Sequence, residues 1–324
     1  MNRNKYLYLL LLFLTACPPV ENTLKAQSDF DLTQRRFNET LYNPAAAGNN
    51  FTTGLYLHGR HQWVGIHRAP STYAVTFDTY VENINSGIGI TYAADNIGVT
   101  NSHSIRVPYA YYLKIGRSSA LSFGLSAGLL VYSKRAGEAL IDDPADPELA
   151  YGNATEYSPD FDFGLEYKGP FKSGITVRHI GTKYTNNFPK HTVNIWAYLS
   201  SRFNATGTLS FEPSISAAYR ANVIRWEAGL LLYFFKTRSR DTYNDRFWLG
   251  AALRRDNGIA LIAGLNITPR LSLGYSFDYG TGQAATLAKY GTHEIFVAFR
   301  FNRIFYKDEF CPAYRNSGIS KRKI

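Results

Sequence analysis

The sequence predicts an all-β transmembrane barrel of about 14 antiparallel strands, the architecture of bacterial outer-membrane proteins. Apolar residues alternate with small or polar residues along most of the chain, which is typical of strands with one apolar face. Aromatic residues make up 15% of the 324 residues, beside 26 glycines. The mean hydropathy is −0.23, and no apolar run reaches the ~18 residues of a membrane helix. A helical membrane protein is therefore excluded.

The alternation is clearest in residues 121–129 and 271–279. Successive side chains of a strand point to opposite faces, so each segment has an apolar face and a face of small or polar residues. Similar segments recur, most of them near the ~9–11 residues that a tilted strand needs to cross a bilayer. The predicted strands are 52–63, 71–80, 86–94, 102–115, 119–133, 157–167, 173–181, 190–202, 207–220, 223–235, 246–254, 257–268, 270–280 and 291–303.

A soluble β-sandwich would also alternate, but two features argue against it. Sandwich strands average ~5–6 residues, about half the length of these segments, and their solvent face is usually rich in charge. Here the second face carries Gly, Ser, Ala and Asn, as a polar lumen would. Aromatic residues near the strand ends are expected to form the girdles at the membrane interfaces: Tyr73, Tyr80, Tyr109, Tyr111, Tyr112, Tyr132, Phe234, Phe235, Phe299 and Phe301.

The N-terminus has the pattern of an export signal. Residues 1–26 combine a basic start with a short apolar core, and cleavage after Ala26 would leave Gln27 as the mature start. A rival site, Leu14–Cys17, resembles a lipobox and would lipidate Cys17. The predicted organisation is a signal peptide (1–26), an N-terminal periplasmic or plug segment (27–50), a barrel (51–303) and a basic periplasmic tail (304–324).

The predicted connections alternate in length, which favours a barrel with both termini in the periplasm and short periplasmic turns. The short turns are 81–85, 116–118, 168–172, 203–206 and 268–269, and 236–245 is an exception. The long connections, 95–101, 134–156, 182–189 and 281–290, would face outward, and 134–156 is acidic. The basic tail would meet an anionic lipid leaflet or an acidic partner. Nucleic-acid binding does not suit an exported chain.

The sequence offers little chemistry, so we expect no enzymatic activity, no cofactor and no metal. It lacks the phosphate-binding, dinucleotide-binding and HExxH motifs. His58 and His61 would face opposite sides of one strand and are poor joint ligands. Charged residues on the small polar faces are expected to form an internal ion-pair network: Asp78, Asp160, Asp162, Glu166, Arg178, Glu227, Arg254 and Arg300.

Residues 43–48 read Asn-Pro-Ala-Ala-Ala-Gly, residues 60–65 read Arg-His-Gln-Trp-Val-Gly, residues 69–72 read Ala-Pro-Ser-Thr, and residues 292–295 read Thr-His-Glu-Ile. In this order, these motifs resemble the PorP/SprF family of type IX secretion system membrane proteins of the Bacteroidota. The resemblance covers essentially the whole mature chain. Arg60, Gln62 and Trp63 would lie where the first strand ends and are expected to hold the N-terminal segment by hydrogen bonds and stacking. The same position also suits the alternative that Trp63 is an aromatic residue of the membrane girdle. The matching positions are Asn43, Pro44, Gly48, Arg60, Gln62, Trp63, Gly65, Pro70, His293 and Glu294.

The resemblance implies a non-catalytic outer-membrane component that supports export or surface attachment of cargo proteins with C-terminal signal domains, gliding adhesins among them. It implies three kinds of partner: periplasmic ring lipoproteins of the secretion machinery, a peptidoglycan-binding adaptor, and the cargo itself. The alternative function is an outer-membrane transport channel for small or hydrophobic compounds, with the N-terminal segment as its plug. Periodicity and composition do not distinguish the two.

Overall fold

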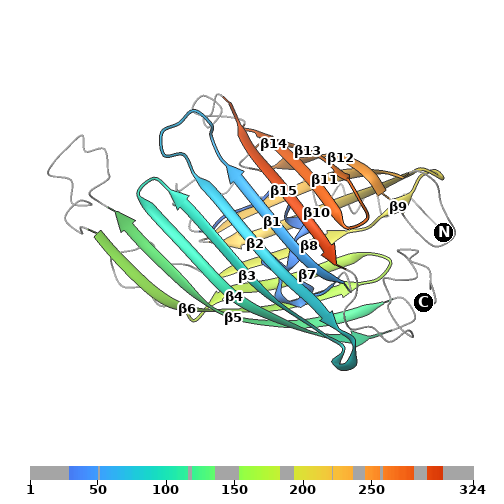
Figure 1. Cartoon of the computed structure of the whole chain (residues 1–324), viewed down its shortest axis with the longest axis horizontal. Helices are drawn as coiled ribbons and strands as arrows, with labels where there is room; N and C mark the ends of the chain where they lie inside the picture. The colour runs from blue at the N-terminus through green and yellow to red at the C-terminus, as the bar shows by residue number, and fades with distance from the viewer. Residues whose placement is uncertain are drawn as a thin grey trace.

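The computed structural model describes residues 29–49, 52–115, 119–135, 153–182, 193–220, 222–235, 245–255, 258–280 and 290–301. Its strands form one antiparallel sheet that closes into a barrel (Figure 1). The short β9 (Phe203–Asn204) follows β8 (Asn194–Ser200) along the same partner, β10 (Leu209–Arg220), so the two form one interrupted strand. The barrel therefore has 14 strands, as predicted.

The chain order of the strands is also their order around the barrel. The seam pairs β1 (Thr53–His61) with β15 (Thr292–Phe301), and β10 pairs with β11 (Val223–Phe235). None of the helices among the described residues is long and apolar enough to cross a membrane. The remaining strands are β2 (Ser71–Val81), β3 (Ser86–Ile97), β4 (Thr100–Lys114), β5 (Ala120–Arg135), β6 (Asn153–Lys168), β7 (Lys172–Ile180), β12 (Asp245–Arg254), β13 (Gly258–Asn266) and β14 (Leu271–Tyr279).

The two faces of the sheet differ as the alternation predicts. Along β2, Thr76 is fully buried, whereas its neighbour Phe77 is 40% exposed. The inner face carries Ser, Thr, Gly and charged residues, and the outer face carries large apolar side chains such as Leu125 and Leu261. An apolar exterior around a polar interior is the arrangement that a bilayer requires of a barrel.

The aromatic residues divide between the two faces, which corrects part of the girdle prediction. Tyr73, Tyr109, Tyr111, Phe299 and Phe301 are exposed on the outer face, as expected. The prediction is wrong for Tyr80, Tyr112 and Tyr132, which are buried on the inner face. The position of each tyrosine along its strand decides which face its ring takes, because these three lie one residue away from outward-facing positions. An aromatic residue near a strand end is therefore not enough to predict an outward-facing ring.

The connections define two ends of the barrel. The turn end carries the β2–β3, β6–β7 and β13–β14 connections, and the loop end carries the β1–β2, β3–β4 and β10–β11 connections. The predicted long connection 95–101 is wrong, because β3 and β4 continue to a tight turn at 98–99, where Gly98 has a φ of +60°. The predicted turn 203–206 shifts to 205–208. The other long connections fall mostly outside the described residues.

The core of the protein lies between the N-terminal segment (residues 29–49) and the inner face of the barrel. Phe30, Leu32, Leu41 and Tyr42 of the segment pack in one buried cluster with residues of β2, β3 and β8, including Trp196. Phe37 packs against Trp248 of β12 and Phe296 of β15, with ring centroids 5.0 Å and 5.5 Å away. A single short segment thus contacts strands in several sectors of the barrel.

Candidate functional site in the N-terminal segment and the inner face

The N-terminal segment folds into three short 3-10 turns, η1 (Arg35–Phe37), η2 (Glu39–Leu41) and η3 (Pro44–Ala46). Asn43 caps η3, because its Oδ1 accepts a hydrogen bond from the Ala45 amide at 3.0 Å. Pro44 fits the first position of the turn, where no amide donor is needed. Gly48 adopts a φ of +68°, and its amide donates to Asp78 Oδ2 at 3.2 Å. The Asn-Pro and Gly positions of the motif are therefore explained by backbone geometry.

Barrel glycines let the segment approach the inner face closely. Gly124 lies against the backbone of Ala45, and Gly164 lies against the side chain of Asn43. At Gly87, an added Cβ would lie 2.5 Å from the carbonyl carbon of Ala47 and still closer to its oxygen. Side chains at these positions would displace the segment, since Cβ atoms essentially never come so close to backbone atoms. The small residues of both partners therefore form one complementary surface.

Glu294 of β15 anchors the start of the segment. Its carboxylate oxygens accept from the backbone amides of Thr33 at 2.7 Å and Gln34 at 3.0 Å. Arg60 of β1 lies beside it, with Nη1 3.1 Å from Glu294 Oε2 and Nη2 2.7 Å from Asp278 Oδ2. Thr33 Oγ1 donates to Asp278 and accepts from Arg60. Two predicted residues, Arg60 and Glu294, therefore bind the segment directly.

Asp29 forms the second anchor. Its Oδ2 lies 3.2 Å from Arg178 Nη1 and accepts from Asn194 Nδ2 at 3.0 Å. Burial alone would raise the pKa of the Asp29 carboxyl. However, the Arg178 charge and the hydrogen bond with His179 outweigh burial and hold that pKa well below its usual range. Asp29 is therefore ionised at neutral pH and fixes the first described residue of the segment to β7 and β8.

The third anchor lies at the turn end. Glu39 Oε1 pairs with Lys172 Nζ at 2.5 Å, and Glu39 Oε2 accepts from Asn49 Nδ2 at 3.0 Å. Lys168 Nζ donates to the Asn49 carbonyl at 2.5 Å. Glu166 accepts from both Asn49 and Tyr198. Charged and polar groups of β6, β7 and β8 thus hold the middle and the last residue of the segment.

One inner cluster has the composition of a metal site. Ligand atoms of Asp160, Asp162 and His179 all lie within 4.8 Å of one another. Arg106 Nη1 lies 3.0 Å from Asp162 Oδ2, and Arg178 Nε lies 4.0 Å from the same atom. A cation would therefore meet two guanidinium groups that already neutralise the carboxylates. The geometry favours an ion-pair cluster over a metal centre.

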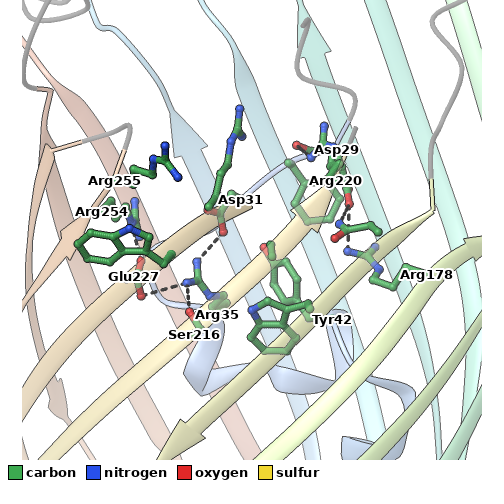
Figure 2. Close-up of a pocket in the computed structure, with 16 residues that line it drawn as sticks. Asp29, Asp31, Arg35, Tyr42, Arg178, Ser216, Arg220, Glu227, Arg254 and Arg255 are labelled. Atoms are coloured by element: carbon green, nitrogen blue, oxygen red, sulfur yellow. Dashed lines mark hydrogen bonds and ion pairs between the residues drawn. The ribbon is translucent and has the colours of Figure 1, made fainter. Parts of the chain in front are cut away.

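A pocket open to solvent lies at the loop end beside the start of the segment. Figure 2 shows Arg35 of the segment in its centre. Arg35 Nη1 pairs with Asp31 at 2.6 Å, and Nη2 pairs with Glu227 of β11 at 3.1 Å. Arg254 of β12 also pairs with Glu227, at 2.5 Å. The pocket is lined jointly by the segment and by β7, β8, β10, β11 and β12.

The structure brings together half of the predicted site residues. Asn43, Pro44, Gly48, Arg60 and Glu294 belong to the segment or contact it. The contacts of Gln62 and Trp63 are backbone contacts at the loop end, where the Gln62 amide donates to the Pro70 carbonyl and the Trp63 amide to Thr292 Oγ1. The expectation that their side chains hold the segment stays a prediction. Gly65 lies near Tyr290. His293 points outward, where its Nδ1 and the Tyr275 hydroxyl share a hydrogen bond of 2.6 Å.

Sequence reasoning also missed several contacts of the segment. The segment residues Asp29, Thr33 and Glu39 were not singled out, because an ionisable residue outside a strand has no periodic pattern to place it. Barrel glycines 87, 124 and 164 were counted only as small polar-face residues. What these three glycines share in the sequence is an inward-facing position in the middle of a strand or near its turn end. The predicted internal ion-pair network is present in part: Asp160 and Asp162 pair with Arg106, Arg178 lies beside Asp162, and Glu227 pairs with Arg254. Asp78 and Glu166 are buried but accept hydrogen bonds from neutral donors, and Arg300 donates to Ser272.

The closed barrel, its apolar exterior and its ionic, segment-lined interior define an outer-membrane β-barrel protein. The comparison with protein families gives the particular family. The chain belongs to the type IX secretion system membrane protein PorP/SprF family, whose model matches residues 24–299. The resemblance drawn from the sequence motifs is thereby confirmed. No curated protein matches the chain.

Two solved structures are similar to this chain at low sequence identity. The CymD monoaromatic hydrocarbon channel has a TM-score of 0.50 at 11% identity, with 82% of this chain and 93% of that chain covered. The P. putida toluene transporter TodX has a TM-score of 0.47 at 10% identity, with 83% of this chain and 95% of that chain covered. At 11% identity, the CymD match shows the barrel fold alone.

Proposed function

We propose that this protein is a non-catalytic outer-membrane component of the type IX secretion system that supports the export or surface attachment of cargo proteins with C-terminal signal domains. Membership of the PorP/SprF family over residues 24–299 carries the proposal. The partners we propose are periplasmic ring lipoproteins, a peptidoglycan-binding adaptor and the cargo. The barrel presents to these partners its two ends and a lipid-facing exterior.

The contacts of the N-terminal segment support a scaffold more than an open solute pore. Leu32, Asn43 and Ala45 are fully buried, and the segment is bound by Glu294 of β15, Asp78 of β2 and Lys172 of β7. These strands lie in different sectors of the sheet. We therefore propose that residues 29–49 plug the lumen. A plug held by ion pairs on several sides would oppose passive passage of solutes.

The proposed orientation places the turn end in the periplasm. Outer-membrane barrels have short periplasmic turns and longer external loops, and the connections 82–85, 169–171 and 267–270 are short. The chain after Phe301 leaves at this end, so the basic tail 304–324 would face the periplasm. It would there meet acidic surfaces of the secretion machinery.

Deletion of the gene in the source bacterium tests the function. We expect loss of a whole set of surface and culture-fluid proteins with C-terminal signal domains, restored by the complete chain. Normal export in the deletion strain would overturn the proposal. A transport channel predicts a different result, because uptake of one class of small or hydrophobic solute would fall while secreted proteins stayed in place.

Co-purification tests the proposed partners. The tagged chain, solubilised from the outer membrane in mild detergent, is expected to retain periplasmic components of the secretion machinery. A chain that ends after residue 303 is the matched variant, because it keeps the barrel and the segment. We expect this variant to reach the outer membrane and to retain less of the periplasmic components. Equal retention would contradict the role of the tail.

A further inference from the structure

The segment begins at the loop end of the barrel. Asp29 contacts Arg178, near the end of β7, and Asn194, at the start of β8. The connection between these strands is a loop-end connection. The Asp29 carbonyl also accepts from Arg220 Nη1 at 2.9 Å, and Arg220 is the last residue of β10. The loop-end termini of β7, β8 and β10 therefore surround the first described residue.

The segment finishes at the opposite end. The Asn49 carbonyl accepts from Lys168, the last residue of β6, next to the turn 169–171. Ala47 and Gly48 lie against Gly87 and Thr79, which flank the turn 82–85 between β2 and β3. All of these positions belong to the turn end. Strand β1 then starts there, with Thr53 opposite Phe301.

We propose that the N-terminal segment is threaded lengthwise through the barrel, so that the chain before Asp29 and the chain after Phe301 leave at opposite mouths. With the turn end in the periplasm, as proposed above, the chain before Asp29 would leave the barrel on the cell-surface side. This differs from the sequence-based expectation that both termini are periplasmic. The threading rests on contacts within this chain and is independent of the secretion function.

Thiol labelling on intact cells tests the threading. In a Cys311→Ser background, Ser28→Cys reports on the N-terminal end and Ser320→Cys on the C-terminal end. His67→Cys marks the loop end and Thr206→Cys marks the turn end, since both residues are exposed. A membrane-impermeant maleimide is applied before and after the envelope is opened.

We expect Ser28→Cys to label like His67→Cys, and Ser320→Cys to label like Thr206→Cys. This pairing holds whichever end faces outward, so it tests the threading separately from the orientation. Labelling of Ser28→Cys in step with Thr206→Cys would overturn the proposal. If the thiol at position 28 is unreactive, an epitope inserted between residues 28 and 29 gives the same readout with an antibody.

Discussion

The substitution Gly87→Ala should release the N-terminal segment while the barrel stays intact. The added Cβ would lie 2.5 Å from the Ala47 carbonyl carbon, whereas ordinary contacts begin at 3.4 Å. The segment must therefore move by at least 3.4 − 2.5 = 0.9 Å. The hydrogen bond from Tyr112 Oη to the Ala47 carbonyl, now 2.7 Å, would then exceed bonding distance. The bond from the Gly48 amide to Asp78, at 3.2 Å, would also break.

The magnitude follows from these two bonds. A neutral hydrogen bond contributes about 1 kcal/mol and a bond to a charged acceptor about 1.5–3 kcal/mol. We expect docking of the segment to weaken by about 3 kcal/mol, roughly a hundredfold in the population of the undocked state. Barrel unfolding should change little, because Gly87 pairs with Ala110 and Tyr80 through backbone groups that alanine retains.

Limited trypsin digestion of the reconstituted barrel measures docking, since Arg35 and Arg36 of the segment become cleavable only when it leaves. We expect much faster cleavage in Gly87→Ala than in the unsubstituted protein. Gly59→Ala is the matched control, because the nearest atom to its added Cβ is 3.8 Å away on the outer face. Cleavage of Gly87→Ala at the rate of the unsubstituted protein would refute the close packing of segment and glycine.

Three further predictions use other contacts. Removing residues 29–49 should raise the conductance of the barrel in planar bilayers, and an unchanged conductance would contradict the plug. Glu294→Ala removes the acceptor of the Thr33 and Gln34 amides. Hydrogen exchange of these two amides should therefore speed up, and docking of the segment should weaken by about 3–5 kcal/mol. Unaltered exchange would show that Glu294 is not an anchor. Leu261→Arg places a charge on the lipid-facing side of β13 and should destabilise the barrel in lipid vesicles by about 2–4 kcal/mol. Urea unfolding measures this loss, with Leu261→Ala as the control. Equal stability of the two variants would contradict a membrane-facing position.

Strand number and face were predictable because alternation is a local property. Each residue of a strand such as 271–279 has only two faces available, and hydrophobicity selects one of them. The same rule explains the errors. Tyr80 and Tyr112 have the ring of a girdle residue, but their inward position fixes them beside the segment. The error at 95–101 arose because polar residues at strand ends look like a loop.

The partners of the segment were harder to predict because they depend on register around the barrel. Arg60 was expected to hold the segment, but its bond to Glu294 requires β1 to pair with β15, where residues 60 and 294 are opposite each other. Asp29 and Arg178 lie 149 positions apart in the chain and meet only once the segment has docked against β7. Trp63 looked suitable for stacking, yet its positive φ of 49° places it in the β1–β2 turn.

The Thr33–Glu294 bond joins residues 261 positions apart in the chain. The segment lies near the start of the chain, yet one of its anchors belongs to the final strand. The seam that closes the barrel joins that same strand to β1, which directly follows the segment. Docking and closure therefore depend on the same late event. Contacts of such long range make folding slow, and a chain that stops short of β15 can neither seal its seam nor secure its interior.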